Sequence, residues 1–385
     1  MRGAPRWLRR FPKFPPMTER SIPVALKPIA RQPIALKPGA TIGILGGGQL
    51  GRMLSVAASR LGFITKIFEP GANPPAGHVA DAVVTAPYED TKALVAFGCS
   101  VDVVTYEFEN VPNESLDALQ EVVAIHPNRA ALGTSQDRLV EKDFLSGLGL
   151  AVAPYAAVDD AAGLTAAVED LGAPAILKSR RLGYDGKGQV RIADSNDIDA
   201  AVEALDGVPS VLEGFVDFSA EISVIAARSG DGSIVCFDPG ENVHSDGILR
   251  TTTVPASVSA ETVAAAVKIA QTIAAALDYI GVLGVELFVT PTGLVVNEIA
   301  PRVHNSGHWT QDGCIVDQFE QHVRAITGLP LGDGQRHSDI RMENLIGDDM
   351  QGLDAVLANP RAAVHLYGKA EVRAGRKMAH VNHLL

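Results

Sequence analysis

Residues 284–309, GVELFVTPTGLVVNEIAPRVHNSGHW, contain two apolar runs separated by the turn TPTG at 290–293. Proline at the second position of the turn and glycine at the fourth are typical of a type I turn, so the two runs are predicted to form a β-hairpin. Glu286 and Glu298 lie symmetrically about this turn, and residues paired across neighbouring strands lie about 5 Å apart. The hairpin is therefore expected to hold two carboxylates side by side.

Two carboxylates at this separation repel each other unless a hard cation with oxygen ligands lies between them. The residues that follow, APRVHNSGH at 300–308, gather hydrogen-bond donors where an anion could bind. A solvated hairpin with a polar loop explains the same pattern equally well. The two glutamates alone leave both interpretations open, and the rest of the chain decides between them.

The composition excludes several classes of protein. A length of 385 residues predicts about two or three domains. The net charge of −12 argues against a nucleic-acid surface, and no apolar run is long enough to span a bilayer. The widely spaced cysteines Cys99, Cys236 and Cys314 indicate buried thiols in a reducing compartment. We therefore expect a cytoplasmic protein with neither nucleic-acid nor membrane partners.

The first 39 residues differ from the rest of the chain. Arginine and proline are frequent there, and no acidic residue precedes Glu19. A transit peptide is one interpretation, but the proline content and the lack of an amphipathic helix favour a disordered leader or a start site assigned too early, with Met17 as the true one. The near-repeat PVALKP at 23–28 and PIALKP at 33–38 predicts an extended arm that leads into the fold.

The segment that begins at Thr41 has the pattern of a nucleotide-binding βαβ unit. A buried strand over 41–45 leads into the loop GGGQLG at 46–51, a helix to about Leu61, and a second strand that ends at Glu69. Strand, G-x-G-x-x-G, helix, strand and acid form a dinucleotide fingerprint, which is typical of a nicotinamide or flavin enzyme. The same loop would serve any phosphate at a helix N-terminus, because glycines let backbone N–H groups approach it closely.

A further strand over 101–105 is followed by Glu107. Ligands of open parallel sheets lie beyond the carboxyl ends of the strands, so Glu107 either faces the ligand of the glycine loop or is a solvated loop acid. A helix is predicted over 133–148, with Arg138 and Lys142 on it.

The next domain contains a short strand over 175–178 that ends in Lys178. The loop GYDGKGQ at 183–189 follows. Its three glycines predict a flexible flap whose amides close over phosphates, with Lys178 as a point charge beneath them. A plain glycine-rich hairpin is the alternative. The spacing is not that of the Walker loop, which needs G-x-x-x-x-G-K-[ST] at the start of a helix.

The strand and turn SVLEGFV at 210–216 are expected to link two lobes and to present backbone donors and acceptors to a purine ring. Glu213 and Glu221 are candidates for contacts with ribose hydroxyls. His244 lies in a predicted polar loop over 241–247, where a lone histidine is usually solvated. The C-terminal region changes to short strands and a basic tail, which either adds solubilising charge or binds a phosphate monoester.

Four segments resemble, in order, the N5-carboxyaminoimidazole ribonucleotide synthetase family of the ATP-grasp superfamily. They are GGGQLGRM at 46–53, GYDGKGQ at 183–189, HSDGILR at 244–250 and NEIAPRVHNSGHWT at 297–310. The likeness extends from about Thr41 to the C-terminus. It implies an α/β and α+β architecture, namely an ATP-grasp fold with an N-terminal Rossmann-like parallel-sheet domain and a small C-terminal β-rich domain. The implied domains are a leader over 1–39, the Rossmann-like domain over 40–140, the two-lobed ATP-grasp domain over 141–328 and the C-terminal domain over 329–385.

The reaction that the resemblance implies converts ATP, bicarbonate and 5-aminoimidazole ribonucleotide into N5-carboxyaminoimidazole ribonucleotide, ADP and phosphate, with Mg²⁺ as the metal. Relatives are commonly dimers, so a homodimer is expected. Formate-dependent glycinamide ribonucleotide transformylase and biotin carboxylase share this layout and are alternatives within the superfamily. Two alternatives belong to other classes. One is a nicotinamide-dependent oxidoreductase, which rests on the glycine loop and Glu69, and the other is a non-catalytic nucleotide sensor.

The resemblance also implies roles for individual residues. Glu286 and Glu298 would hold Mg²⁺. The residues expected to contact ATP are Arg138, Lys178, Gly183, Tyr184, Asp185, Gly186, Lys187, Gly188, Gln189, Glu213, Gly214, Phe215, Val216, Glu221, His244, Asn297 and Glu298. Those expected to bind the aminoimidazole ribonucleotide are Gly48, Gln49, Leu50, Glu107, Tyr184, Lys187, Arg302, His304, Lys369 and Arg376. Catalytic roles are expected for Arg302, His304, Asn305 and Lys187. Many relatives carry arginine at the last of these positions, so a bidentate contact becomes a single one here.

Overall fold

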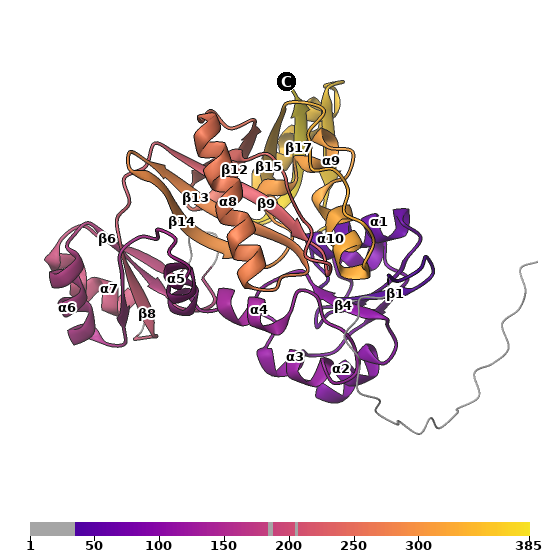
Figure 1. Ribbon diagram of the computed structural model, residues 1–385, viewed down its shortest axis with the longest axis horizontal. Helices are drawn as coiled ribbons and strands as arrows, with labels where there is room; N and C mark the ends of the chain where they lie inside the picture. The colour runs from indigo at the N-terminus through magenta and orange to yellow at the C-terminus, as the bar shows by residue number, and fades with distance from the viewer. Residues whose placement is uncertain (1–34, 184–187, 205–206) are drawn as a thin grey trace, which may run out of the picture. The chain divides into compact units, whose positions relative to one another are not determined.

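The structure, a computed structural model, describes residues 35–183, 188–204 and 207–385 (Figure 1). These ranges leave out most of the predicted leader and four residues of the predicted flap, Tyr184, Asp185, Gly186 and Lys187. The end of the predicted leader is described, and it packs on the folded body. The N–H of Leu36 donates to the carbonyl of Thr327 at 2.8 Å, and the Leu36 side chain packs against the main hydrophobic core.

The predicted βαβ unit is confirmed as part of a four-stranded parallel sheet with the order β3-β2-β1-β4. The strands are β1 (Thr41–Leu45), β2 (Ile64–Phe68), β3 (Ala82–Val84) and β4 (Val103–Tyr106). Helix α1 (Gln49–Arg60) follows the glycine loop, and α2 (Thr91–Gly98) and α3 (Asn113–Leu119) cover the sheet (Figure 1). Strand β1 is buried from Ile42 to Leu45, as an uninterrupted apolar run in a central parallel strand predicts.

The prediction of one helix over 133–148 is wrong. The segment belongs to two helices, α4 (Arg129–Ser135) and α5 (Arg138–Gly147). Asp137 separates them, because its backbone is extended with φ −127° and its carboxylate caps α5 by accepting the N–H groups of Leu139 and Val140. The break places Arg138 in the first turn of α5.

A small antiparallel sheet with the order β5-β8-β6-β7 contains the strand that carries Lys178. Its strands are β5 (Tyr155–Val158), β6 (Ala175–Ser179), β7 (Gln189–Ile192) and β8 (Ser210–Gly214). Helices α6 (Ala161–Leu171) and α7 (Ile198–Ala204) pack on it around Leu164, Leu177 and Leu212.

The third sheet has nine antiparallel strands, of which eight follow the order β14-β13-β9-β11-β12-β15-β17-β16, while β10 pairs with β9. They are β9 (Ala220–Arg228), β10 (Ile234–Cys236), β11 (Gly240–Ser245), β12 (Ile248–Val254), β13 (Gly281–Thr290), β14 (Gly293–Ala300), β15 (Ile340–Ile346), β16 (Ala362–Leu366) and β17 (Lys377–Leu384). Because β15 pairs with β12, the C-terminal strands extend the sheet that holds the hairpin.

Alternate residues of β9 face two different cores, as a strand with two buried faces requires. Val224 and Ala226 pack in the core that includes α8 (Ala260–Ala276), and α8 lies across this sheet in Figure 1. Ile225 and Ala227 pack in the core that includes α1 and α10 (Gln318–Thr327). Ser259 is the N-cap of α8, since its side chain accepts the N–H of Thr262.

The predicted hairpin is confirmed as β13 and β14, and a bulge determines which residues face each other. Thr290 pairs with Gly293 and Leu287 with Val296, and the same register would set Glu286 opposite Asn297. The register shifts between Glu286 and Leu287, so that Glu286 pairs with Glu298 instead. One extra residue on β14 therefore brings the two carboxylates opposite each other.

Two further expectations need correction. His244 lies in strand β11 rather than in a polar loop, because β11 pairs with β9 on one side and β12 on the other. The cysteines are free, but only Cys314 is buried, while Cys236 is partly buried and Cys99 is exposed at the end of α2. Across the described parts of the chain, every helix is too short or too polar to cross a bilayer.

Candidate active site

One cavity of about 990 Å³ brings most of the predicted site residues together. They come from α5, β6, β7, β9, β11, β13, β14, the glycine loop, the segments that follow β4, β6 and β14, and the C-terminal tail. The predicted residues that line it are Gln49, Leu50, Glu107, Arg138, Lys178, Gly183, Gln189, Glu221, His244, Glu286, Asn297, Glu298, Arg302, His304, Asn305, Lys369 and Arg376. The described residues that were predicted but do not line it are Gly48, Gly188, Glu213, Gly214, Phe215 and Val216.

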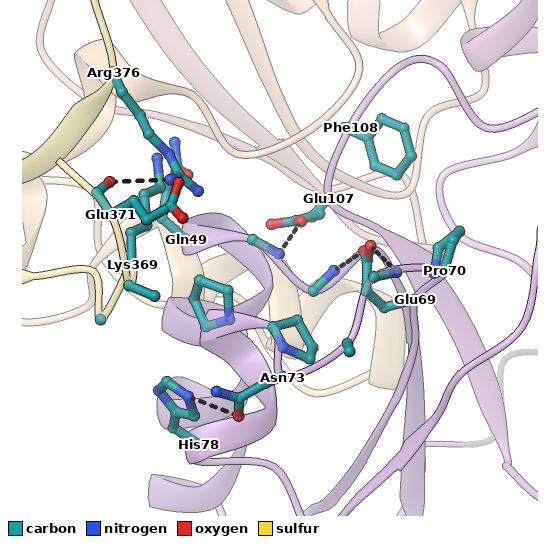
Figure 2. A pocket seen from close by; sticks show the side chains of 18 of the residues that line it. Gln49, Glu69, Pro70, Asn73, His78, Glu107, Phe108, Lys369, Glu371 and Arg376 are labelled. Atoms are coloured by element: carbon teal, nitrogen blue, oxygen red, sulfur yellow. Dashed lines mark hydrogen bonds between the residues drawn. The ribbon is translucent and has the colours of Figure 1, made fainter. Parts of the chain in front are cut away.

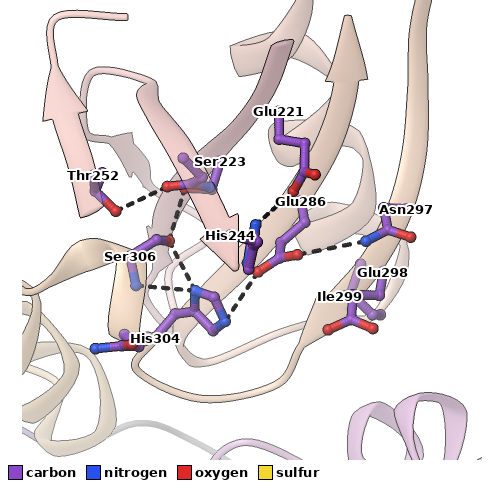
Figure 3. Close-up of polar contacts among 12 residues, drawn as sticks. Glu221, Ser223, His244, Thr252, Glu286, Asn297, Glu298, Ile299, His304 and Ser306 are labelled. Atoms are coloured by element: carbon purple, nitrogen blue, oxygen red, sulfur yellow. Dashed lines mark hydrogen bonds and ion pairs between the residues drawn. The ribbon is translucent and has the colours of Figure 1, made fainter. Parts of the chain in front are cut away.

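The hairpin carboxylates have different surroundings in this cavity (Figure 3). Oε1 of Glu286 lies 3.4 Å from Nε2 of His304, and Oε2 of Glu286 accepts the side-chain amide of Asn297 at 3.5 Å. Burial, together with the charge of Glu298, raises the pKa of Glu286 to about 7. Burial would raise the pKa of Glu298, but Arg138, in contact at 3.1 Å, and the charges of Lys178 and Lys142 together hold it below its usual range.

The paired carboxylates fit a divalent cation. The charge of one carboxylate raises the pKa of the other, so a cation between them would relieve the repulsion. Among the described residues, no group of three or more His, Cys, Asp and Glu side chains is arranged to hold a metal. Mg²⁺ does not need one, because it is commonly bound by one or two carboxylates together with substrate phosphates.

A buried charge cluster lies under the cavity. Oε2 of Glu213 contacts Nζ of Lys178 at 3.0 Å and Nζ of Lys142 at 3.3 Å. Lys142 also donates to the carbonyl of Asn297 at 2.8 Å, which ties α5 to the hairpin. Burial would raise the pKa of Glu213, but the two ammonium groups hold it below its usual range. Only one carboxylate oxygen of Glu213 contacts the lysines, and its expected contact with a ribose stays a prediction.

The sequence analysis did not assign Lys142 a part in this charge cluster. One signal was available: Lys142 follows Arg138 by one helical turn, which places a charged side chain on the buried face of the predicted helix. The neighbouring Glu141 is also buried and accepts the N–H of Ile299 at 2.7 Å. Burial, followed by the charge of Glu298, raises the pKa of Glu141 to about 8.

His244 and Glu221 form an ion pair at one side of the carboxylates (Figure 3). Nδ1 of His244 lies 2.7 Å from Oε2 of Glu221. Burial would lower the pKa of His244, but the carboxylates of Glu221 and Glu286 raise it above its usual value. The two residues therefore offer a cation and an anion to the same ligand.

The residues after the hairpin are held by contacts that the sequence did not indicate. Arg302 pairs with Glu109, which lies two residues after Glu107, and this contact keeps the pKa of the guanidinium above its usual value despite burial. Asn305 and Asn344 exchange side-chain amide hydrogen bonds at 2.9 and 2.8 Å. Arg302 thus keeps a fixed position at the cavity wall, and Asn305 is anchored to β15.

The side chain of Glu107 is bonded to backbone amides of the glycine loop (Figure 2). Its carboxylate is buried and accepts the N–H groups of Gly48 and, at 2.6 Å, Gly51. Glu69 accepts the N–H of Gly47 at 2.8 Å. The amides that a dinucleotide pyrophosphate would need are therefore already bonded to carboxylates, which disfavours the nicotinamide-dependent alternative.

A second cavity, of about 640 Å³, adjoins the same loop (Figure 2). It shares Gln49, Glu107, Lys369 and Arg376 with the larger cavity, and Gly48 lines only this one. Lys369 donates to the carbonyl of Lys377 at 2.6 Å, and Arg376 donates to the carbonyl of Glu371 at 3.0 Å. The basic tail is thus folded against the loop, and Lys369, Arg373 and Arg376 line both cavities.

The arrangement defines a class of protein. After an N-terminal parallel-sheet domain, a lysine-bearing strand of a small antiparallel sheet lines one cavity together with a carboxylate pair on a second sheet. These are the parts of an ATP-grasp enzyme. Family models match the same parts: residues 39–136 match the ribonucleotide synthetase preATP-grasp domain, residues 143–319 the ATP-grasp domain, and residues 341–385 the phosphoribosylaminoimidazole carboxylase C-terminal domain.

Comparison with individual relatives identifies the family within the ATP-grasp class. An N5-carboxyaminoimidazole ribonucleotide synthase from Brucella melitensis is 55% identical over 353 residues, which cover 91% of this chain and 98% of the relative. The solved ADP complex of an N5-carboxyaminoimidazole ribonucleotide synthetase superposes with a TM-score of 0.89 at 41% identity, covering 91% of this chain and 94% of that one. The Aspergillus clavatus synthase, solved with ADP and 5-aminoimidazole ribonucleotide, has a TM-score of 0.86 at 33% identity, covering 90% of this chain and 94% of that one. The chain belongs to the N5-carboxyaminoimidazole ribonucleotide synthase family.

Proposed function

We propose that this chain catalyses the ATP- and bicarbonate-dependent carboxylation of 5-aminoimidazole ribonucleotide to N5-carboxyaminoimidazole ribonucleotide, a step of purine biosynthesis. The observation that carries the proposal is one cavity that holds cations suited to a nucleotide, paired carboxylates suited to a divalent metal, and donors suited to a one-carbon anion. The cations are Arg138 and Lys178, the paired carboxylates are Glu286 and Glu298, and the donors are Arg302 and His304. The 55% identity to the Brucella synthase supports the same conclusion.

The chemistry explains why these three groups are needed together. Bicarbonate is a poor electrophile because its leaving group is hydroxide. Transfer of the γ-phosphoryl group of ATP to a bicarbonate oxygen gives ADP and carboxyphosphate, in which phosphate is the leaving group. The substrate amine then forms the C–N bond while the C–O bond to phosphate breaks, and the amine loses a proton. Phosphoryl transfer depends mainly on alignment and charge neutralisation, which fixed cations supply.

On the nucleotide side, Arg138 and Lys178 would contact the phosphates. Glu286 and Glu298 would hold Mg²⁺, and the bound ion would neutralise phosphate charge. Burial lowers the pKa of Lys178, and the carboxylate of Glu213 opposes this effect. Glu213 therefore acts through Lys178, keeping it charged for the phosphates.

On the one-carbon side, Arg302 and His304 would contact bicarbonate and the transferring carboxyl group. The pairing with Glu109 fixes the direction of the Arg302 guanidinium. Arg302 would supply positive charge to the developing phosphate, and His304 would supply a hydrogen bond. Fixed donors of this kind stabilise charge that develops in the transition state.

The ribonucleotide would lie where the two cavities meet. Its phosphate would contact Lys369 and Arg376, with the backbone N–H groups of Gln49 and Leu50, while Gly48 is already bonded to Glu107. Flap residues Tyr184 and Lys187, proposed to line the aminoimidazole side, lie outside the described residues. A homodimer and a cytoplasmic location complete the proposal, and they rest on the family resemblance.

Phosphate release, measured with each substrate omitted in turn, tests the function. Release should require ATP, bicarbonate and 5-aminoimidazole ribonucleotide together, and it should stop on addition of a chelator. Release that is independent of the ribonucleotide would overturn the proposal. Replacing bicarbonate with formate, or the ribonucleotide with glycinamide ribonucleotide, should give no turnover; turnover there would favour the transformylase alternative.

A further inference from the structure

The side chain of His304 is held by contacts that define which of its nitrogens carries the proton. His304 caps the 3₁₀ turn at Asn305–Gly307, and Nδ1 accepts the backbone N–H of Ser306 at 3.3 Å. The hydroxyl of Ser306 lies 2.8 Å from the same nitrogen. A backbone N–H can only donate, so Nδ1 must present a lone pair. The proton of the neutral ring is then on Nε2.

A second hydroxyl orients the first (Figure 3). Ser223 in β9 donates to Oγ of Ser306 at 2.7 Å, and both serines are buried. Because Oγ of Ser306 accepts from Ser223, its own hydrogen is directed to Nδ1 of His304. Ser223 of β9 therefore donates to Ser306, and Ser306 donates to the imidazole of His304.

The backbone and the ring of His304 are also fixed from other sides. Gln318 accepts the N–H of His304 at 2.9 Å and donates to its carbonyl at 2.8 Å. The ring lies against Gly284, where a Cβ atom would come within 2.9 Å of Cβ and 3.0 Å of Cγ of His304. With the ring held in this way, Nε2 faces Oε1 of Glu286 at 3.4 Å, and the ionised form of this carboxylate accepts a hydrogen bond from Nε2–H.

We propose that Ser306 is a positioning residue that fixes the tautomer of His304, so that His304 presents Nε2–H to the cavity as a hydrogen-bond donor. This inference rests on the proposed function for its consequence, which is that His304 donates to an oxygen of the transferring carboxyl group. A nitrogen that already carries a proton cannot accept one, so His304 is not the base for the substrate amine. Ser223 supports Ser306 in the same role.

The tautomer can be measured without turnover. Histidine labelled with ¹³C and ¹⁵N distinguishes the two tautomers by NMR, and loss of one signal in His304→Gln assigns the resonance. The Nε2–H form is expected in the wild-type chain, and a smaller share of it in Ser306→Ala, where the backbone N–H at 3.3 Å is the remaining donor to Nδ1. The Nδ1–H form in the wild-type chain would overturn the proposal. Failure of the proposed function would leave this measurement unaffected.

Kinetics test the consequence. Loss of the Ser306 hydroxyl should lower kcat for ribonucleotide-dependent phosphate release about tenfold, and it should leave KM for ATP within about twofold. Ser306→Thr, which keeps the hydroxyl, should restore most of the rate. The matched control is Ser115→Ala, a buried serine whose hydroxyl bonds the carbonyl of Tyr88, and it should turn over like the wild type. An unchanged kcat in Ser306→Ala would contradict the proposal.

A second pair of variants does not depend on how the serine site tolerates substitution. Glutamine keeps an N–H donor near the position of Nε2, whereas alanine removes it. We therefore expect kcat of His304→Gln to exceed that of His304→Ala by about tenfold. Equal rates for the two variants would mean that the donor is not what His304 contributes.

Discussion

Replacement of Glu213 by glutamine tests the buried charge cluster, because it removes one negative charge and keeps the shape of the side chain. In the wild-type chain, a single carboxylate oxygen serves two ammonium groups, Lys178 at 3.0 Å and Lys142 at 3.3 Å. The side chains are only 5% exposed for Glu213, 12% for Lys178 and 2% for Lys142. The variant would leave two buried cations beside each other without a counter-charge.

The magnitude follows from this burial. Removing one partner of a buried ion pair costs about 3–5 kcal/mol of folding free energy, because the other charge stays buried and unpaired. A loss of this size should lower Tm by about 4–7 °C for a protein of this length, because the unfolding entropy is about 2.1 cal/mol/K per residue. The pKa of Lys178, already lowered by burial, should fall further without Glu213. ATP affinity of the variant should therefore decrease as pH rises, since Lys178 loses its proton.

Thermal unfolding of four proteins measures the effect: the wild type, Glu213→Gln, Lys142→Met and the double variant. Lys142→Met leaves a neutral pair and should cost only about 1 kcal/mol, mainly from the lost bond to the carbonyl of Asn297. The double variant has one unpaired cation instead of two, so it should regain about 2 kcal/mol relative to the sum of the single changes. A Tm of Glu213→Gln equal to that of the wild type, or strict additivity in the double variant, would refute the reasoning.

Three further predictions concern the metal pair, the tail and a buried histidine. Glu298→Gln should reduce ADP formation by more than about 100-fold while the far-UV spectrum and Tm stay near those of the wild type; normal turnover would remove Glu298 from the metal site. Lys369→Ala should raise KM for the ribonucleotide about tenfold with little change in KM for ATP, and the exposed Lys92→Ala is its control; equal weakening of both substrates would mean that the tail is misassigned. Burial lowers the pKa of His322 to about 3, so its folded form stays neutral while the unfolded chain binds a proton below about 6.5. The free energy of unfolding should therefore fall as pH decreases from 7, and this residue should contribute about 2 kcal/mol of that loss at pH 5. Chemical denaturation of His322→Gln should show a smaller loss over the same pH range. A pH dependence equal to that of the wild type would contradict this.

The hairpin illustrates what the sequence could predict and what it could not. Two apolar runs and the turn between them are local features, and they predicted β13 and β14 correctly. A bulge sets Glu286 opposite Glu298, in a strand that also pairs with β9, where Glu286 lies opposite Ser223. The pairing of β13 with β9 joins segments distant in sequence, so the sequence does not reveal it. Symmetry about the turn therefore identified the pair Glu286 and Glu298 correctly but did not predict the bulge between Glu286 and Leu287.

The remaining differences also arise from contacts distant in sequence. The glycine loop was predicted from its spacing, but Glu107, which occupies its amides, lies 59 residues from Gly48. His244 was expected in a loop because polar residues surround it, whereas its pairing with Leu249 of β12 holds it in β11. The split between α4 and α5 could have been found locally, since Asp137 is a favourable N-cap residue ahead of a helical run.

The continuous pairing from β12 to β15 limits how this chain can be divided. The hydrogen-bonding groups of β12 from Thr251 to Val254 are covered by β15, and β15 is covered in turn by β17. A fragment that ends at Gly328 would expose an unprotected strand edge beside a partly emptied core, and such edges recruit further copies into aggregates. The last strands therefore cover an edge that would otherwise promote aggregation, and biochemical work on the nucleotide-binding part should keep residues 340–385.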